Sequence, residues 1–404
     1  MKVLMVNNLY APDFRGGAER SVQLLAEALV VGGTEVTVVC TAPAPQAATE
    51  LNGVKVVRIG LANAYWPFGD ATISSLRRKF WHLFDTYNPV MKARLVEVLR
   101  REQPDIVHTN NLQGISVLAW RAASVCGVPV LHTLRDYYLS CARASRFRNG
   151  RYCSSTCFAC VPFCAARRYP SDVVDAVVGT GQFILDRHTE LKFFPPQALR
   201  TVIANSAIAV ETKRPTGRSL TFGYLGRLAP FKGVELLVRA FANRNDGGWE
   251  LLIAGTGQPA DVDHLQALAA KASRPDQIRF LGWTESAEFL RCVDVLVVPS
   301  LWQEPLSRAA IEAQVSGIAV VASRRGGLSE VVEDGVTGKL FDPDEDGDLV
   351  RTIESLLAHP EQARRFGDAA RTRADRFRPA VVAAQYLRAY EEVLVNRSRA
   401  QTSS

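Results

Sequence analysis

The chain has 404 residues, of which 47% are hydrophobic and 22% are charged. That length exceeds what one hydrophobic core usually supports and predicts two domains, while no apolar run approaches the roughly 20 residues that a membrane-spanning helix needs. The formal net charge of +7 favours an anionic ligand or surface, but it does not choose between a nucleotide, a nucleic acid and a lipid headgroup.

The first residues, MKVLMVNNLYAP, contain a short apolar run. A signal peptide needs a longer apolar region and a small-residue cleavage site, so the run fits a first β-strand better and we expect a cytoplasmic protein. Gly16 and Gly17 follow this strand and open a helical pattern. A glycine pair there would let a phosphate or an acceptor approach backbone amides, although it does not make a full dinucleotide fingerprint.

Strands and helices alternate through the first half of the chain. Strand patterns cover 2–7, 35–40, 54–59, 105–108, 128–132 and 173–178, and helical patterns cover 18–31, 91–101 and 115–126. Such alternation is typical of a parallel, doubly wound α/β sheet. We expect this first domain to span 1–210.

Basic and aromatic residues lie together at 77–84, which reads RRKFWHLF. On a helix this mixture suits the face of an anionic membrane. An ordinary amphipathic helix packed on its own domain explains the segment as well, and both interpretations stay open. No nucleic-acid-binding motif accompanies the positive charge, so we expect no nucleic acid as a partner.

Five of the eight cysteines crowd one segment. They are Cys141, Cys153, Cys157, Cys160 and Cys164. Such density in a chain without an export signal favours metal or redox chemistry over a disulfide framework. Four thiolates could close a structural zinc site in an insertion at about 136–170. Free thiols and disulfides are the alternatives, and the ligand set stays open.

The spacing from Cys153 to Cys160 also matches the cluster-binding signature of radical SAM enzymes. Those enzymes surround the cluster with a barrel of further strands and helices. Here the segment interrupts a doubly wound domain, which argues against that class.

A polar stretch at 211–219, ETKRPTGRS, interrupts the alternation, and a second series follows it. Its strand patterns cover 220–225, 250–254, 278–281, 295–298 and 318–322, and its helical patterns cover 234–242, 263–271, 286–292 and 307–315. We expect a second doubly wound domain at 218–378 that faces the first across a cleft. Residues 361–396 have a helical pattern, and the polar residues 397–404 are expected to be disordered.

Residues at two strand ends of the second domain predict an anion site. Arg227 and Lys232 follow the strand at 220–225, where two cations can neutralise a departing diphosphate. Gly255 and Gly257 follow the next strand, where the absence of a side chain lets the backbone approach a ligand. Turn chemistry alone would also explain these two glycines.

Glu304 and Glu312 are the most informative residues of the chain. The strand at 295–298 stops at Pro299, a loop carries Glu304, and a helix from Ser307 carries Glu312. A helix N-terminus at the carboxyl end of a parallel strand binds anions. A diphosphate there would place Glu312 near a ribose and Glu304 near a sugar. The alternative is that both glutamates are solvated surface charges.

From 220 to 341 the chain resembles the donor-sugar signature of retaining, family-four glycosyltransferases of the GT-B fold. In that signature a Glu, seven intervening residues and a second Glu grip a nucleotide sugar, as Glu304 and Glu312 would here. The resemblance covers nearly the whole chain. It implies two Rossmann-like α/β domains, with a Cys-rich insertion in the acceptor-side first domain and a last helix, 379–396, that crosses back to that domain.

The resemblance also implies an activity. The protein would move a sugar, with retention, from a nucleotide-diphosphate donor to a hydroxyl of a glycan or lipid-linked acceptor, as in the synthesis of cell-surface polysaccharide. No cofactor would be needed for catalysis. A lipid-linked acceptor would place the protein peripherally on the inner face of the cell membrane.

Residue roles follow from the same resemblance. Glu304 would bind the donor sugar hydroxyls and Glu312 the ribose, while Arg227 and Lys232 would hold the phosphates. The other expected donor contacts are the backbone amides of Leu306, Ser307 and Arg308 and the glycines Gly16, Gly17, Gly255 and Gly257.

The first domain departs from the family at one position. The family often has His-Asp where this chain has Arg135-Asp136, so Arg135 would touch the transferred sugar. Asp136 is a further catalytic candidate, and the substitution leaves both its role and the donor sugar open.

Two other function classes remain. A GT-B epimerase or phosphorylase would use the same cleft, although a phosphorylase would show a cofactor lysine and an epimerase would need acid and base carboxylates that the sequence does not place. A non-catalytic nucleotide-sugar-binding protein that assembles a polysaccharide complex is the second class.

Overall fold

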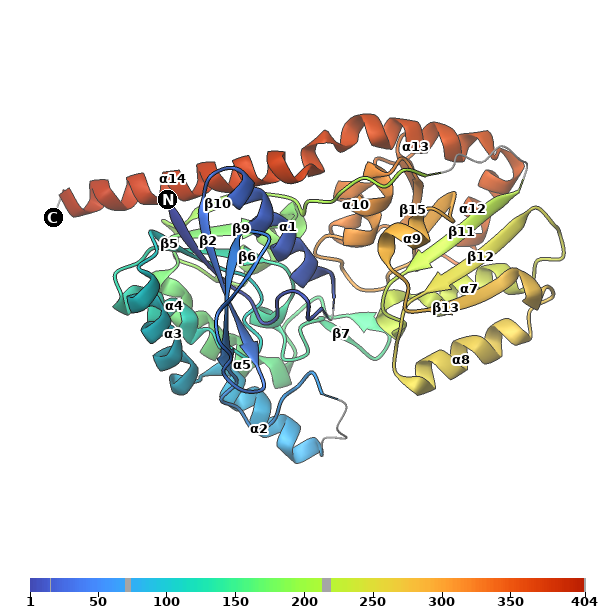
Figure 1. The fold of residues 1–404 in the computed structure, drawn as a ribbon. Coiled ribbons are helices and arrows are strands. Elements are labelled where there is room, and N and C mark those ends of the chain that lie inside the picture. The colour runs from blue at the N-terminus through green and yellow to red at the C-terminus, as the bar shows by residue number, and fades with distance from the viewer. Residues whose placement is uncertain (15, 70–73, 213–218, 403–404) are drawn as a thin grey trace. The chain divides into compact units, whose positions relative to one another are not determined.

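The computed structural model describes residues 1–14, 16–69, 74–212 and 219–402 (Figure 1). Most of the stretch predicted to separate the domains, at 213–218, lies outside these residues. The chain divides into two compact units, described separately below. The first unit comprises Met1–Arg146, Ser154–Ser206 and Pro379–Ser404, and the second comprises Phe147–Cys153 and Ala207–Arg378.

The first unit is built on an eight-stranded sheet with the order β10-β9-β6-β5-β1-β2-β4-β3. Its strands are β1 (Lys2–Val6), β2 (Glu35–Ala42), β3 (Thr49–Leu51), β4 (Val54–Gly60), β5 (Ile106–Thr109), β6 (Val130–Leu134), β9 (Ala176–Gly179) and β10 (Leu199–Val202). All neighbours are parallel except β3 and β4, which are antiparallel. The chain starts at β1 in the middle of the sheet and winds outward in both directions, which confirms the doubly wound prediction.

Helices and short 3₁₀ turns connect these strands. They are α1 (Gly17–Val31), α2 (Ser75–Thr86), α3 (Pro89–Glu102), α4 (Leu118–Val125), η1 (Tyr138–Ser140), η2 (Phe158–Cys160), α5 (Val161–Arg168), η3 (Tyr169–Val173) and α6 (Gln182–Glu190). The starts of α2 and α3 follow local rules, because Ser74 accepts a hydrogen bond from the Arg77 amide and Asn88 accepts one from the Met91 amide. Pro89 at the first position of α3 needs no backbone donor.

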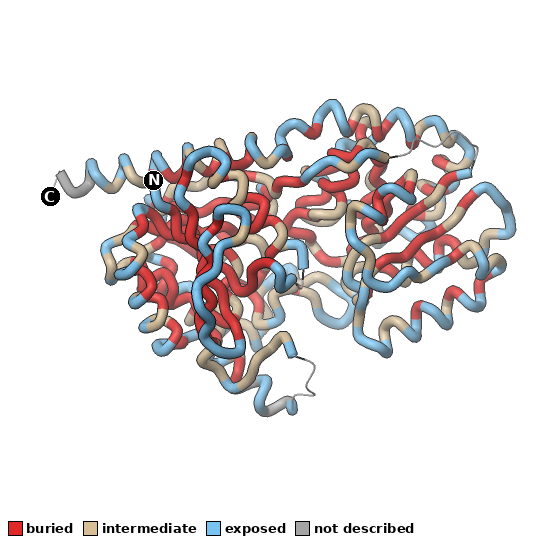
Figure 2. Tube along the Cα trace, in the orientation of Figure 1, coloured by how far each residue is buried: buried red, intermediate tan, exposed pale blue. Residues whose placement is uncertain are grey.

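Helix α14 (Pro379–Thr402) completes the core of the first unit. Its buried residues pack with α1 and the central strands and are Val382, Ala383, Tyr386, Ala389, Tyr390 and Val393 (Figure 2). The helical pattern at 361–396 covers α13 (Glu361–Arg373), η6 (Ala374–Phe377) and α14, which starts at Pro379, where the last helix was expected. One sequence prediction was wrong here, because residues 397–402 continue α14 and are not disordered.

The second unit has a six-stranded, fully parallel sheet with the order β13-β12-β11-β14-β15-β16. Its strands are β11 (Leu220–Leu225), β12 (Trp249–Ala254), β13 (Ile278–Gly282), β14 (Val295–Val298), β15 (Ala319–Ser323) and β16 (Gly338–Phe341). This sheet is also doubly wound, starting at β11, as the sequence predicted. Phe147–Arg148 (β7) and Arg151–Tyr152 (β8) form a separate antiparallel hairpin.

The remaining elements flank this second sheet. They are η4 (Pro230–Lys232), α7 (Val234–Ala242), α8 (Pro259–Ala270), η5 (Pro275–Gln277), α9 (Ser286–Leu290), α10 (Arg308–Val315), α11 (Leu328–Val331), α12 (Asp348–Ala358) and α13. The four central strands carry mainly apolar residues because helices cover the sheet, and β14 is buried along its whole length. The sheet therefore presents polar groups to solvent mainly where strands end.

Candidate functional site

The topology marks one place in each sheet where connections diverge. In the second unit this switch point lies between β11 and β14, which pair from Phe222↔Val295. In the first unit it lies between β1 and β5, which pair up to Val6↔Thr109. Ligands of open α/β sheets bind beyond the carboxyl ends of the strands at such points. The residues that follow these strand ends are therefore the candidates for a functional site.

Arg227 and Lys232 follow β11 at the switch point of the second unit. The buried Tyr224 at the end of β11 donates its phenol hydrogen to the Arg227 carbonyl at 2.7 Å, which fixes the loop backbone. Burial raises the pKa of Tyr224, and the negative charge of Glu304 raises it further. Arg227 itself is exposed, whereas Lys232 is the last residue of η4 and is partly buried.

Glu304 and Lys232 are brought together although 72 positions separate them. The Lys232 Nζ donates to Glu304 Oε1 at 2.7 Å, and the Ser300 hydroxyl donates to the same oxygen at 2.6 Å. Glu304 is only 4% exposed. It is therefore not a solvated surface charge, and that alternative from the sequence is wrong for this residue.

Glu312 lies on α10 with two partners of its own. Arg308 donates to its Oε1 from one helical turn earlier, and the Ser286 hydroxyl donates to its Oε2 at 2.6 Å. The side chain of Ser307 caps the helix by accepting from the Ala310 amide. Leu306 directly before this cap is buried. Glu312 is thus 9% exposed and held at the first turns of a helix that starts beyond β14.

Packing within the protein itself explains why Gly255 and Gly257 are glycines. A Cβ at Gly255 would lie 1.8 Å from the Gly226 carbonyl oxygen, and one at Gly257 would lie 2.1 Å from the Leu228 oxygen. Gly255 also has a φ of +144°. The loop after β12 therefore packs backbone to backbone on the loop after β11. This explains both glycines without a ligand, and their contact with a donor stays a prediction.

In the first unit, Gly16 and Gly17 lie where α1 begins. Gly16 is the N-cap residue and offers no side chain to the free amides of the first turn. Glu19 in that turn is 4% exposed, and its Oε2 would lie 3.5 Å from a Cβ at Gly16. Burial is the main cause of the raised pKa of Asp136, and the charge of Glu19 adds to it.

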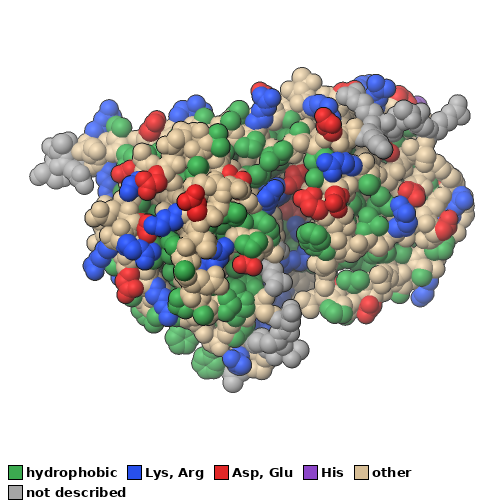
Figure 3. All heavy atoms as spheres, viewed as in Figure 1, with side chains coloured by type: hydrophobic (Ala, Val, Ile, Leu, Met, Phe, Trp, Pro, Cys, Tyr) green, Lys and Arg blue, Asp and Glu red, His purple; other side chains and the backbone are tan. Residues whose placement is uncertain are grey.

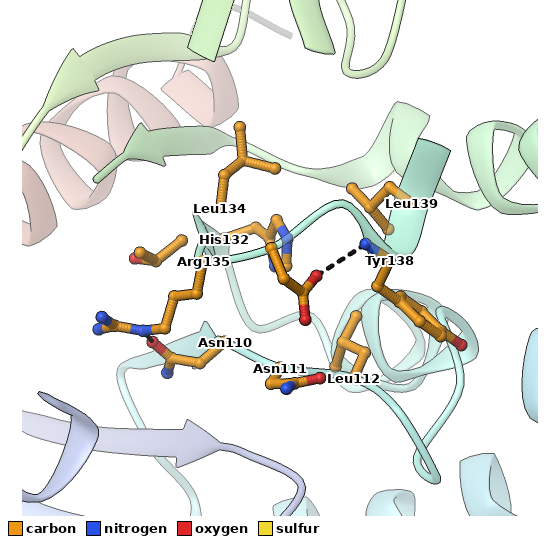
Figure 4. A pocket seen from close by; sticks show the side chains of 10 residues that line it. Asn110, Asn111, Leu112, His132, Leu134, Arg135, Tyr138 and Leu139 are labelled. Carbon is orange, nitrogen blue, oxygen red and sulfur yellow. Dashed lines mark hydrogen bonds between the residues drawn. The ribbon is translucent and has the colours of Figure 1, made fainter. Parts of the chain in front are cut away.

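Arg135 and Asp136 follow β6 and line a pocket. Arg135 donates to Asn110 Oδ1 at 2.8 Å (Figure 4) and to Asn205 Oδ1 at 2.6 Å. The Tyr138 amide donates to Asp136 Oδ1 at 2.7 Å. The lining residues are Asn110, Asn111, Leu112, His132, Thr133, Leu134, Arg135, Asp136, Tyr138 and Leu139. Burial raises the pKa of Asp136 to about 6, so its carboxyl titrates close to neutral pH.

The two histidines beside this pocket are buried and neutral. Burial lowers the pKa of His132 to about 3 and that of His108 well below its usual value. His108 bonds Thr133 through Nε2 and Tyr390 through Nδ1, both at 2.7 Å, and His132 Nδ1 bonds Thr109 at 2.9 Å. These rings join β5, β6 and α14, which is a structural role.

Cys141, Cys160 and Cys164 of the insertion are free thiols. Burial raises the pKa of Cys160 to about 12, and neighbouring Cys157 and Cys141 add to the effect. Within the residues that the structure describes, no three His, Cys, Asp or Glu side chains are placed to hold a metal ion. The thiol arrangement therefore gives no support to the structural zinc, which stays a prediction for Cys141, Cys153, Cys157, Cys160 and Cys164.

The insertion is anchored by a buried ion pair. Arg167 and Asp85 are both fully buried, with Arg167 Nη2 3.8 Å from Asp85 Oδ2. The Arg167 guanidinium also lies over the ring of Tyr138, 3.8 Å from its centroid. Burial raises the pKa of Asp85 to about 6 despite the opposing charge of Arg167. This pair ties α5 to α2 and to the turn after Asp136.

Sequence reasoning missed several residues of these sites. They are Glu19, Asn110, Asn111, Tyr224, Ser286 and Ser300. Asn110, Asn111 and Ser300 follow directly on β5 and β14, and a search for polar residues just beyond parallel strands would have found them. Ser286 gave no such signal, because its contact with Glu312 depends on tertiary packing.

Comparison with known protein families gave two matches. Residues 209–373 match the model of glycosyl transferases group 1, and residues 16–205 match that of the glycosyl transferase 4-like domain. An uncharacterized 42.6 kDa protein in the cps region of Klebsiella pneumoniae is 32% identical over 82% of this chain and 87% of its own. The glycogen synthase of Mycobacterium tuberculosis strain H37Rv is 28% identical over 92% and 90%, respectively.

Solved structures share the fold. The sucrose-phosphate synthase of Thermosynechococcus elongatus superposes with a TM-score of 0.74 over 98% of this chain and 99% of its own, at 20% identity. HepE of Anabaena, solved in complex with UDP and glucose, superposes with a TM-score of 0.71 over 97% and 99%, at 19% identity. At these identities the likeness concerns the GT-B fold and not the ligand.

Proposed function

Because this chain belongs to the group 1 glycosyl transferases and is a glycosyltransferase of the GT-B fold, we propose that it transfers a sugar with retention from a nucleotide-diphosphate donor. The acceptor is a hydroxyl of a glycan or of a lipid-linked saccharide, in the synthesis of cell-surface polysaccharide. The cps-region relative supports this role.

One observation carries the proposal. The second unit gathers two cations and two buried carboxylates beyond β11 and β14, on both sides of its switch point. Arg227 and Lys232 supply positive charge for the diphosphate, with the amides of Leu306, Ser307 and Arg308 at the start of α10. Glu312 would bind the ribose and Glu304 the sugar hydroxyls. A carboxylate suits a hydroxyl because it is a strong hydrogen-bond acceptor.

The first unit supplies the acceptor side of the proposal. Its candidate is Asp136 after β6, while the neighbouring Arg135 would touch the transferred sugar and Gly16 and Gly17 at the start of α1 would contact the donor. Asp136 would accept a hydrogen bond from the acceptor hydroxyl and assist loss of its proton, since its carboxyl titrates near neutral pH. No metal ion enters any of these steps.

We place the protein in the cytoplasm, peripherally on the inner face of the membrane. The described residues include no helix that is long and apolar enough to cross a bilayer. The anionic membrane is proposed as a contact of α2, whose exposed residues include Arg77, Arg78, Phe80 and Phe84. The side chain of Lys79 lies outside the described part.

Thermal unfolding with a panel of nucleotides tests the central claim. UDP, GDP, dTDP and ADP are added one at a time, followed by their common sugar derivatives. We expect one base to raise the melting temperature, because a ligand at about 100 times its Kd adds roughly 2.7 kcal/mol to the free energy of unfolding. Arg227→Ala should reduce that shift, whereas Glu333→Gln, a surface change in the same unit, should not.

Transfer is then measured with the sugar form of that base and cell-envelope glycolipids. Glu304→Ala should lower the transfer rate by at least about a hundredfold, and nuclear magnetic resonance of the product reports whether the anomeric configuration is kept. If none of the nucleotides shifted the melting temperature, the proposed function would be wrong. An inverted product would contradict retention alone.

A further inference from the structure

Glu304 and Lys232 form an ion pair in the protein itself. The Nζ to Oε1 distance is 2.7 Å, and the two side chains are 5% and 22% exposed, respectively. Both residues are proposed to face the donor, one its sugar and the other its phosphates. In the structure they instead face each other, so the charge that would bind a phosphate is already neutralised.

The carboxylate of this pair is held rigidly. The Ser300 hydroxyl donates to Glu304 Oε1, and the Ser323 hydroxyl donates to the Ser300 carbonyl at 2.6 Å. A Cβ at Gly326 would lie 2.3 Å from the Glu304 carbonyl oxygen, so the backbone of Glu304 is packed without spare room. The Gly327 amide also donates to that oxygen at 2.7 Å.

Lys232 is the adjustable partner. It has four rotatable side-chain bonds, and its ammonium lies 4.8 Å from the centroid of the Trp302 ring. Its backbone is fixed at the end of η4, because a Cβ on the following Gly233 would lie 1.9 Å from the Pro299 carbonyl oxygen. The ammonium can therefore turn between the carboxylate and a phosphate while both backbones stay in place.

We propose that Glu304 is the resident counter-ion of Lys232 and that it weakens the binding of the nucleoside diphosphate product. An anionic diphosphate must draw Lys232 away from a carboxylate that already neutralises it, and the buried carboxylate repels the phosphates. While the donor is bound, its sugar hydroxyls occupy Glu304 and leave Lys232 to the phosphates. Once the sugar has been transferred, Glu304 pairs with Lys232 again and the diphosphate leaves.

This inference rests on the proposed nucleotide site but makes a prediction that sugar binding alone does not. Glu304→Gln keeps an oxygen that accepts a hydrogen bond from Lys232 and removes the negative charge. The ammonium then stays in place with its charge unmasked. We expect the nucleoside diphosphate without sugar to bind about three- to tenfold more tightly to this variant than to the original protein.

Isothermal titration calorimetry of the whole chain measures this affinity with UDP, GDP, dTDP and ADP. Glu333→Gln is the matched control, since it makes the same change of charge at an exposed ion pair with Arg373. It should leave the affinity within about twofold, because an exposed charge is screened by water and salt. Glu304→Asp is the second variant, because its shorter side chain holds Lys232 less closely and should give a smaller gain.

The outcomes separate the two claims. If the original protein binds none of the four nucleotides, the proposed function itself fails. If it binds one of them and Glu304→Gln binds that nucleotide equally or more weakly, the counter-ion role is wrong. If Glu304→Gln weakened the binding of the nucleotide sugar alone, Glu304 would be a sugar contact only.

Discussion

Asp85 and Asp136 are two carboxyls of the first unit with similar pKa values and different surroundings. Burial raises the pKa of each to about 6. Asp136 lines a pocket and accepts from the Tyr138 amide. Asp85 is fully buried and faces the guanidinium of Arg167. Removing the two carboxylates should therefore have opposite consequences for stability.

For Asp136, the raised pKa means that the folded state binds a proton more tightly than the unfolded state between about pH 4 and 6. Stability consequently falls as the pH rises through that window. At pH 7.5, Asp136→Asn should raise the free energy of unfolding by about 1–2 kcal/mol, because the charge that burial disfavours is gone. Denaturant unfolding at pH 7.5 and pH 5 measures this, and the gain should fall to about half at pH 5 and vanish only below about pH 4. A variant less stable than the original at pH 7.5 would contradict the argument.

Asp85→Asn is the matched comparison. Removing the Asp85 carboxylate leaves the buried Arg167 guanidinium without a negatively charged partner. This should lower the free energy of unfolding by about 3 kcal/mol at pH 7.5. Transfer activity should separate the two residues further. Asp136→Asn loses the proposed proton acceptor while gaining stability, so low activity there could not be attributed to unfolding.

At the scale of elements, α14 is joined to the sheet by side-chain hydrogen bonds. Tyr390 and Tyr386, one turn apart, reach His108 and Thr133 on β5 and β6 at 2.7 and 3.1 Å, respectively. Thr133 also lines the pocket, together with Arg135 and Asp136. The helix therefore supports the strand ends from which the acceptor-side candidates project.

Tyr390→Phe should destabilise the first unit more than Tyr386→Phe. Without the Tyr390 phenol, the buried Nδ1 of His108 loses its partner, which costs about 1–3 kcal/mol. Thr133 keeps its bond to His108 when the Tyr386 phenol is removed, so that variant should lose about 1 kcal/mol or less. Thermal and urea unfolding of both variants measures the difference. Equal losses would show that the network does not depend on His108.

How far the elements could be predicted depended on their sequence pattern. The strand and helix positions around β11, α7 and β14 were predicted to within a residue, because aliphatic runs and glycines bound them. The short β10 and β16 were missed, because their sequences, LRTV and GKLF, mix polar with apolar residues, whereas β14 is entirely aliphatic.

For the candidate sites, the sequence located residues but not their partners. Strand ends followed by cations and glutamates were visible, and the resemblance assigned their roles. The pairing of Lys232 with Glu304 joins loops that are 72 positions apart, and no local pattern encodes it. The pKa of Asp136 likewise depends on burial by residues from several segments.

At the scale of the whole molecule, exposed apolar and basic side chains gather on α2 and the start of α3. The exposed hydrophobic residues are Phe80, Leu83, Phe84, Tyr87 and Val90, and Figure 3 shows hydrophobic side chains at the surface over α2. Arg77 and Arg78 are exposed on the same helix. The one acidic residue of α2, Asp85, is buried, so this face repels no anionic lipid.

Vesicle co-sedimentation tests the proposed membrane contact. We expect binding to vesicles that contain phosphatidylglycerol, weaker binding to phosphatidylcholine alone, and loss in high salt. Replacing Phe80 and Phe84 by Ser should lower binding at least about fivefold. Val31→Ser is the control, because Val31 is 88% exposed on the separate helix α1. Equal binding by the double variant and the control would contradict a membrane role for α2.

Helix α14 has a consequence for how the chain is made. The N-terminus of a protein emerges from the ribosome first, and domains that are contiguous in sequence usually fold in that order. Here the core of the first unit includes Val382 to Val393, whereas the second unit ends at Arg378. The unit begun first is thus completed last and must wait, with part of its apolar surface uncovered, while the second unit is synthesised. A nonsense mutation just before residue 379 would spare the core of the second unit and leave the core of the first unit unfinished.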